Sequence, residues 1–126
     1  MTPSRPAGLL GTPPGSAWPG PDTPHGDDPN PFVRFRHLLW AHRAALAAAL
    51  TDSAYVDMVR RLDDAVAEVD GTGFRTTPLL PVSELAAAFG QRGGLWAKDE
   101  TGNVSGTHKA RHLFGLVLHL EVQGVP

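Results

Sequence analysis

The sequence contains no cysteine, and this absence removes several classes of function at once. Without a thiol the chain cannot form a disulfide scaffold, use a cysteine nucleophile, hold an iron–sulfur cluster or bind zinc through thiolates. No apolar run approaches the roughly 20 residues that a membrane-spanning helix requires. The N-terminus also lacks the basic and apolar regions of a secretory signal. These absences predict a cytoplasmic protein that is not inserted in a membrane.

An excess of positive charge is also missing. The 11 Lys and Arg residues are outnumbered by 13 Asp and Glu residues, which gives a formal net charge of -2. Proteins that bind nucleic acid or anionic lipid normally present a basic field, so neither partner is expected. With 126 residues, of which 41% are hydrophobic and 19% charged, the chain suits one small globular domain with room for a tail.

Proline and glycine are concentrated near the N-terminus. Nine of the 12 prolines and five of the 14 glycines lie in residues 1–31. A stretch with so few large apolar residues cannot bury enough surface to offset the entropy lost when it becomes ordered. Residues 1–29 are therefore predicted to be a disordered tail.

Hydrophobic periodicity predicts two helices after this tail. The first is capped by Asn30 and carries apolar side chains at helical spacing as far as Leu50. The second is expected to begin at a cap formed by Thr51 or Asp52. It should end at Gly71, because glycine readily adopts the left-handed conformation that closes a helix.

Beyond the second helix, the helical spacing of apolar residues gives way to segments rich in proline and glycine. Residues 75–81 contain two prolines and are expected to be extended. A short helix at 83–89 and a brief strand at 95–98 should follow. A glycine-bearing loop at 99–107 then leads into a final helix at 108–121. Helices followed by a strand, a loop and a helix predict an α/β domain.

This α/β domain is expected to be incomplete. One short strand cannot make a sheet, and an isolated apolar strand is unstable in water. We therefore expect residues 72–126 to be the first part of a larger domain, or part of an assembly with another chain. Residues 30–71 would form a helical extension that precedes this domain.

The densest polar cluster lies at the predicted start of the final helix. His108, Lys109 and Arg111 fall in its first turn, where the helix dipole disfavours cations. Ser105 and Thr107 bring hydroxyl groups close to backbone N–H groups that have no partner within the helix. An anionic group, phosphate above all, would stabilise such a helix start. The alternative is an ordinary solvated loop with scattered charges.

The polar cluster resembles the cofactor-lysine segment of fold type II pyridoxal-phosphate enzymes. This group includes threonine synthase, threonine dehydratase, cysteine synthase and the tryptophan synthase beta subunit. The family pattern is a strand ending in Lys-Asp/Glu, a loop with Asn, then Thr/Ser-Gly-small-Phe/His-Lys and a helix. The matching residues here are Lys98-Asp99-Glu100, Asn103 and Ser105-Gly106-Thr107-His108-Lys109, with Thr77-Pro78-Leu79 similar to the family's upstream Thr-Pro-Leu. The resemblance covers about residues 74–122, less than half of the chain.

The resemblance implies a pyridoxal 5'-phosphate-dependent lyase or synthase. It would act on an amino-acid substrate by elimination or replacement at the β or γ carbon. Lys109 would form the Schiff base with the cofactor and later move the α-proton. His108 would lie against the cofactor, and Ser105, Gly106 and Thr107 would shape the loop that presents the lysine. The resemblance also implies a homodimer for the full-length enzyme.

The chain departs from this family in the motifs that it lacks. The family's substrate-carboxylate loop, its glycine-rich phosphate cup and the Ser or Cys beside the pyridine nitrogen have no counterpart before Pro126. We therefore expect the chain alone to be inactive. The alternative is a non-catalytic remnant or a small helical interaction module in which residues 32–70 bind a partner. Metal binding is not expected, because His108 and His112 lack a third ligand on the same helical face.

Overall fold

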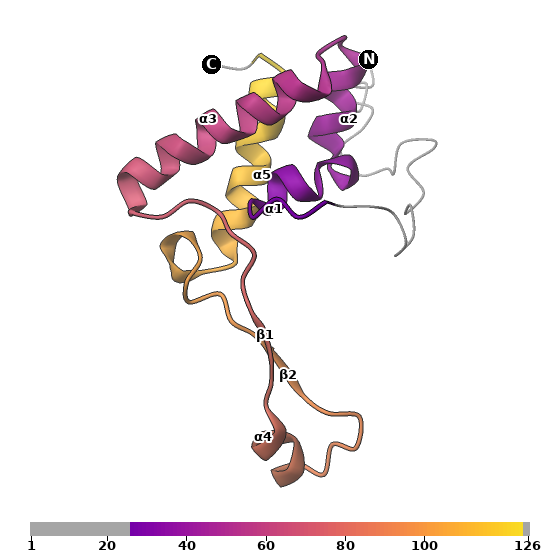
Figure 1. Ribbon diagram of the computed structural model, residues 1–126, viewed down its shortest axis with the longest axis vertical. Helices are drawn as coiled ribbons and strands as arrows, with labels where there is room; N and C mark the ends of the chain where they lie inside the picture. Colours follow the sequence, from indigo (N-terminus) through magenta and orange to yellow (C-terminus); the bar gives the residue numbers. More distant parts are fainter. Residues whose placement is uncertain (1–25, 125–126) are drawn as a thin grey trace, which may run out of the picture.

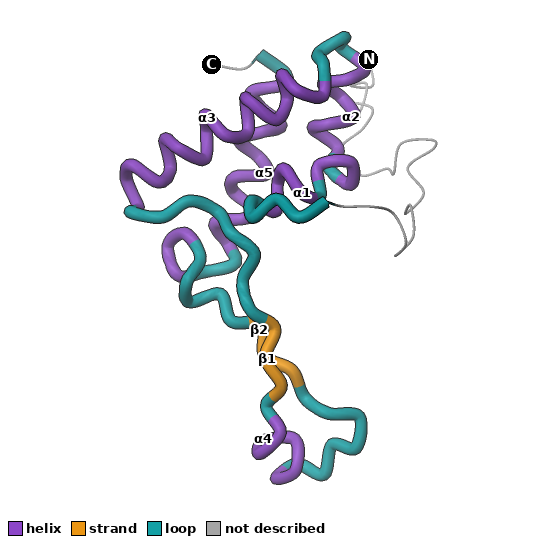
Figure 2. The backbone as a smooth tube through the Cα atoms, in the orientation of Figure 1, coloured by secondary structure: helices purple, strands orange, loops and turns teal. Residues whose placement is uncertain are grey.

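The computed structural model describes residues 26–124, which form a helical body with a long projecting ribbon (Figure 1). The order of elements is α1 (Pro31–Arg34), η1 (Arg36–Leu38), α2 (Trp40–Ala47), α3 (Asp52–Asp70), β1 (Leu79–Pro81), α4 (Ser83–Ala88), β2 (Trp96–Lys98), η2 (Val104–Gly106) and α5 (Lys109–Val122). The described part is thus rich in helix, with one small antiparallel sheet of two strands (Figure 2). None of its helices is long and apolar enough to cross a membrane.

The single helix predicted from Asn30 to Leu50 is wrong, because this segment forms three short pieces. Asn30 does cap α1, since its side chain accepts a hydrogen bond from the α1 backbone at 2.8 Å. The chain then leaves the helical conformation, and Leu39 is extended (φ -84°, ψ 135°) before α2 begins. Arg36 stabilises this break by donating to an α1 carbonyl at 2.9 Å and to the Asp52 carboxylate at 2.7 and 2.8 Å.

The predictions for the ends of α3 are confirmed. Thr51 is the cap, and its hydroxyl accepts a hydrogen bond from Ala54 N at 3.2 Å. Gly71 closes the helix in the left-handed conformation, with a φ of 84°. Between these ends, Tyr55 and Val59 are fully buried. The helix therefore contributes one wall of the hydrophobic core.

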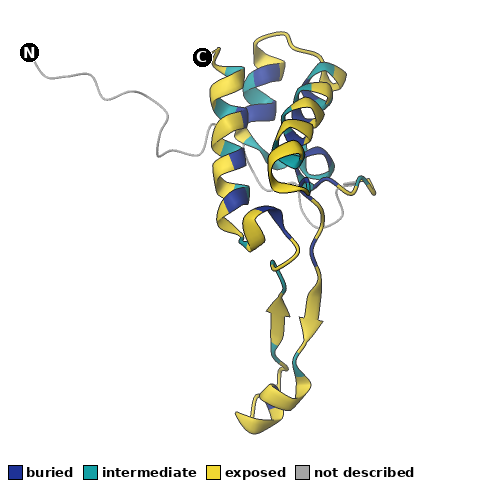
Figure 3. Ribbon diagram, turned by 90° about the vertical axis from the view of Figure 1, so that its left-hand side faces the viewer, coloured by how far each residue is buried: buried dark blue, intermediate teal, exposed yellow. Residues whose placement is uncertain are grey.

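One core joins the segments that were predicted to be separate units. At its centre Phe32, Phe74 and Phe114 pack together, with ring centroids 4.6 to 5.1 Å apart. These rings come from α1, from the segment after α3 and from α5. The buried faces of the helices point toward one another (Figure 3). The predicted boundary between 30–71 and 72–126 therefore does not separate two cores.

The end of the predicted tail contacts this body. Residues 1–25 of that tail lie outside the described residues. In the described remainder, Asp28 accepts a hydrogen bond from Arg60 on α3 at 3.2 Å. Pro29 O accepts another from Thr76 N at 3.0 Å. The described structure therefore begins its contacts slightly before Asn30.

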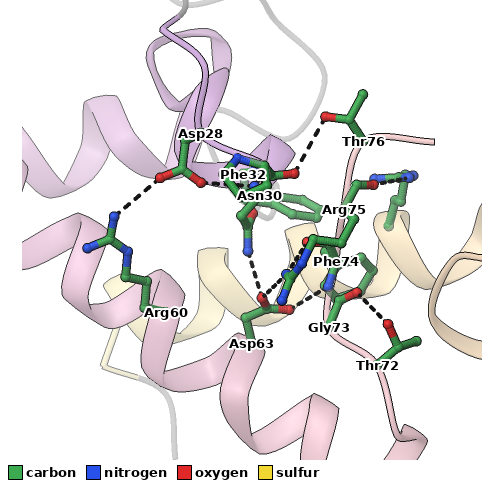
Figure 4. A network of polar contacts seen from close by, with 12 residues as sticks. Asp28, Asn30, Phe32, Arg60, Asp63, Thr72, Gly73, Phe74, Arg75 and Thr76 are labelled. Atoms are coloured by element: carbon green, nitrogen blue, oxygen red, sulfur yellow. Dashed lines mark hydrogen bonds and ion pairs between the residues drawn. The ribbon is translucent and has the colours of Figure 1, made fainter. Parts of the chain in front are cut away.

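Asp63 anchors the chain where it leaves the helical body. Its buried carboxylate accepts hydrogen bonds from Asn30 Nδ2 at 2.8 Å, Phe74 N at 2.7 Å and Arg75 Nη1 at 3.2 Å (Figure 4). Gly73 allows the close approach, because a Cβ atom there would lie 2.8 Å from Asp63 Oδ2. A buried carboxylate is costly unless its oxygens receive donors, so these partners hold the start of the ribbon against α3.

The ribbon consists of β1 and β2 in antiparallel register. Leu79 is paired with Lys98, and Pro81 with Trp96. The strand predicted near residues 95–98 therefore has a partner within the chain, and the expectation that it lacks one is wrong. Both strands are exposed along their length, and α4 lies at the end of the ribbon far from the helical body (Figure 3).

Candidate functional site

A cluster of side chains lies where the ribbon joins the helical body. Thr77 stands two residues before the start of β1, and Lys98 ends β2. Glu100 follows two residues later, and Arg111 lies in the first turn of α5. These four residues lie at the base of the ribbon and are called the base cluster below. They come from three segments of the chain. Thr77, Lys98 and Glu100 belong to the motifs that carry the resemblance to fold type II enzymes, and Arg111 follows two residues after the last of those motifs.

Glu100 is the shared acceptor of the base cluster. Its Oε1 accepts a hydrogen bond from Thr77 Oγ1 at 2.5 Å, and its Oε2 accepts one from Arg111 Nε at 2.9 Å. Lys98 Nζ lies 3.7 Å from Oε1. Burial raises the pKa of Glu100, but the hydrogen bonds from Thr77 and Arg111 and the charges of Arg111 and Lys98 outweigh it. The pKa of Glu100 therefore lies below its usual value, and the group is a carboxylate at neutral pH.

Thr77 is buried and uses its hydroxyl group fully. The hydroxyl donates to Glu100 and accepts hydrogen bonds from Lys98 Nζ at 2.6 Å and from Arg111 Nη2 at 3.2 Å. One proton and two lone pairs are thus all engaged. Lys98 Nζ also donates to the Thr77 carbonyl, and Arg111 Nη2 donates to Arg75 O at 2.9 Å. The hydroxyl therefore links the ribbon to α5.

Lys109 differs from Lys98 in the surroundings of its amine. These two residues are the only lysines in the sequence. Lys109 is exposed at the first position of α5, and its Nζ has no hydrogen bond or ion pair to any residue in 26–124. Reaction with an aldehyde removes N–H groups from an amine, so Lys109, whose N–H groups have no acceptor in this part of the chain, would lose less on reacting than Lys98.

The predicted loop residues form a compact turn directly before α5. Ser105 and Gly106 both adopt the left-handed conformation, with φ values of 55° and 61°. Asn103 Nδ2 closes the turn by donating to Thr107 O at 2.8 Å, and Thr107 Oγ1 accepts from the first N–H of α5 at 3.3 Å. Asp70, at the end of α3, accepts from Ser105 N at 3.0 Å. The turn is thus attached to the helical body.

His108 resembles Lys109 in that its side chain is exposed. His108 is exposed at the N-cap of α5, and its side chain makes no capping hydrogen bond. Its predicted place beside a cofactor stays a prediction. A pocket of about 380 Å³ lies next to the turn, between α3 and α5. Its lining is mainly apolar and includes Ser105 and Val117, but not Lys109.

Sequence reasoning missed Thr77 and Glu100 as members of the site. Both stand in motifs that the resemblance uses, so the signal was present in the sequence. Their contacts depend on the pairing of β1 with β2, which the sequence did not predict. Arg111 fixes the start of the loop by donating a hydrogen bond to Glu100.

The described residues offer no evident metal site. Within 26–124, no three His, Asp or Glu side chains gather closely enough to hold a metal ion.

Comparisons of the chain with protein-family models, with curated proteins and with solved structures found no match. The chemistry of the site is therefore the basis on which a function can be proposed.

Proposed function

We propose that Lys109 is the attachment lysine of a pyridoxal-phosphate-dependent enzyme that acts on an amino acid by elimination or replacement. The observation that carries this proposal is the base cluster. Thr77, Glu100 and Arg111 come from the three segments that resemble fold type II enzymes, and they bind one another directly. These contacts hold the first turn of α5, which carries Lys109, against the base of the ribbon.

The chain's own residues have distinct roles in this proposal. Lys109 Nζ would bond to the aldehyde carbon of the cofactor. When the substrate amine displaces it, the same nitrogen would take the proton from the substrate α-carbon. Pyridoxal phosphate, when bound, supplies the electron sink for the charge left on that carbon. Ser105, Gly106 and Thr107 would hold the turn that presents the lysine, and His108 would lie beside the cofactor.

The test is covalent labelling of the whole 126-residue chain with pyridoxal phosphate and borohydride, followed by peptide mapping. The neutral lysine nitrogen adds to the aldehyde carbon, and the aldehyde oxygen leaves as water. Hydride from borohydride then reduces the C=N bond, and the nitrogen takes a proton, so the label stays where the amine reacted. We expect Lys109→Ala to lose most of the lysine label, and the matched control Lys98→Ala to keep it. Equal labelling of the two variants would contradict the proposal.

A second candidate is a protein-interaction module without catalysis. It is favoured by apolar side chains exposed on α2, among them Trp40 and Leu46, and on α5, among them Leu113 and Leu120. Exposed apolar groups of this kind often mark a surface that another polypeptide covers. Under this alternative, Lys109→Ala would leave partner binding unchanged, and neither lysine would be labelled in preference to the N-terminal amine.

A further inference from the structure

Exposure alone does not distinguish the two lysines. The side chain of Lys98 is 49% exposed, so a dissolved aldehyde can reach it, and Lys109 is exposed as well. Their difference lies in hydrogen bonding. Lys98 Nζ donates to the carbonyl and the hydroxyl of Thr77 and lies beside the Glu100 carboxylate. Lys109 Nζ has no such partner within the described residues.

We propose that Thr77 and Glu100 are positioning residues that restrain Lys98, so that an aldehyde cofactor reacts at Lys109. When Lys98 Nζ adds to an aldehyde carbon and water leaves, the nitrogen loses N–H groups, so at least one of its two hydrogen bonds to Thr77 is lost, and this cost disfavours reaction at Lys98. The Glu100 carboxylate adds electrostatic attraction for the charged amine. This inference rests on the proposed function, because it explains which amine the cofactor selects.

Arg111 connects this restraint to the helix that carries Lys109. It stands two residues after Lys109, in the same first turn of α5. Its guanidinium binds both Glu100 and Thr77, the two residues that hold Lys98. The carboxylate that restrains one lysine therefore also fixes the turn that presents the other. One cluster thus acts on both amines.

The selectivity is measured as the ratio of label on Lys98 to label on Lys109. The full chain is treated with pyridoxal phosphate, reduced with borohydride and mapped. Thr77→Val removes the hydroxyl but keeps the shape of the side chain, and we expect the ratio to rise about fivefold, as for one lost hydrogen bond. Thr77→Ser retains the hydroxyl and is the matched control, so its ratio should stay at the wild-type value.

Glu100→Gln provides an independent variant should Thr77→Val fail to fold. It removes the charge and should raise the ratio in the same direction. Glu84→Gln is its control, because it makes the same chemical change at an exposed carboxylate in the first turn of α4, at the far end of the ribbon. Ratios are compared only among variants whose far-ultraviolet circular dichroism matches the wild type, because unfolding would also free Lys98.

Failure of this inference can be told apart from failure of the proposed function. If the wild type is labelled at Lys109 and the ratio stays unchanged in the folded variants, the restraint is refuted while the proposed function stands. If the wild type is labelled at neither lysine, the proposed function is refuted and the inference with it. Label on Lys98 that equals or exceeds the label on Lys109 in the wild type would also overturn the restraint.

Discussion

Replacing Asp63 with Asn should destabilise the fold by about 2–4 kcal/mol. The figure follows from the two oxygens of the buried carboxylate. Oδ1 accepts from Phe74 N, and Oδ2 accepts from Asn30 Nδ2 and Arg75 Nη1. An amide has one oxygen and one NH2 group, so either orientation directs the NH2 group at a buried donor. One orphaned donor costs about 1–3 kcal/mol, and the loss of charge weakens the remaining bonds.

Urea unfolding measures this difference, and the chain supplies a matched control. Asp64 is the next residue on α3 and is exposed. Asp64→Asn makes the same chemical change and should alter stability by no more than about 0.5 kcal/mol. The slope of the unfolding free energy with urea should stay constant, so that the midpoint reports stability. Equal midpoints for Asp63→Asn and Asp64→Asn would refute the reasoning.

Two further predictions concern pH. Tyr55 is the only tyrosine, and burial raises its pKa to about 12 from 10.0, so an ultraviolet titration of the folded protein should show little tyrosinate below that pH. The stability that the neutral Tyr55 side chain contributes is fully present below pH 10.0 and is lost as the pH rises toward about 12. Tyr55→Phe should not lose stability in this pH range through this group. Ionisation of Tyr55 near pH 10 in the folded protein would contradict the prediction. Hydrogen bonds from Arg36 and His42 lower the pKa of Asp52 to about 2 from 3.8, so its charge stabilises the fold above pH 3.8, and this contribution is lost as the pH falls through about 2. Above pH 3.8, the unfolding free energies of wild type and Asp52→Asn should differ by about 1 kcal/mol or less, because solvent screens the half-exposed Asp52 carboxylate. Their urea midpoints should converge as the pH falls through about 2. A difference that stays constant would argue against the pairing of Asp52 with Arg36 and His42.

The ends of the helices could be predicted from the sequence because they depend on close neighbours. Thr51 accepts from an N–H three residues later, and Gly71 needs only its own left-handed backbone. The break at Leu39 could not be predicted in this way. It is held by Arg36 through Asp52, which lies 16 positions further along the chain. The spacing of apolar residues within the segment cannot reveal a contact with a residue so far along the chain.

A strand at residues 95–98 was predicted, but its pairing with β1 was missed for a different physical reason. Strand prediction relies on alternation between buried and exposed positions. Both β1 and β2 are exposed on every residue, so the sequence carries no such alternation. The lysine and its turn were recognisable from a motif. The part played by Glu100 was not, because Thr77 and Arg111 stand 34 positions apart and meet only when the ribbon is formed.

Because the ribbon is long, insertions and deletions should be tolerated at its tip but not at its base. Its tip, which consists of α4 and the loop that leads from α4 to β2, lies far from the helical body (Figure 1). Residues could be gained or lost there without moving Thr77 or Glu100, since exposed loop tips accept such changes readily. A one-residue slip in strand pairing would instead turn every side chain to the opposite face. Relatives of this chain should thus vary in length at the tip and keep a constant spacing at the base.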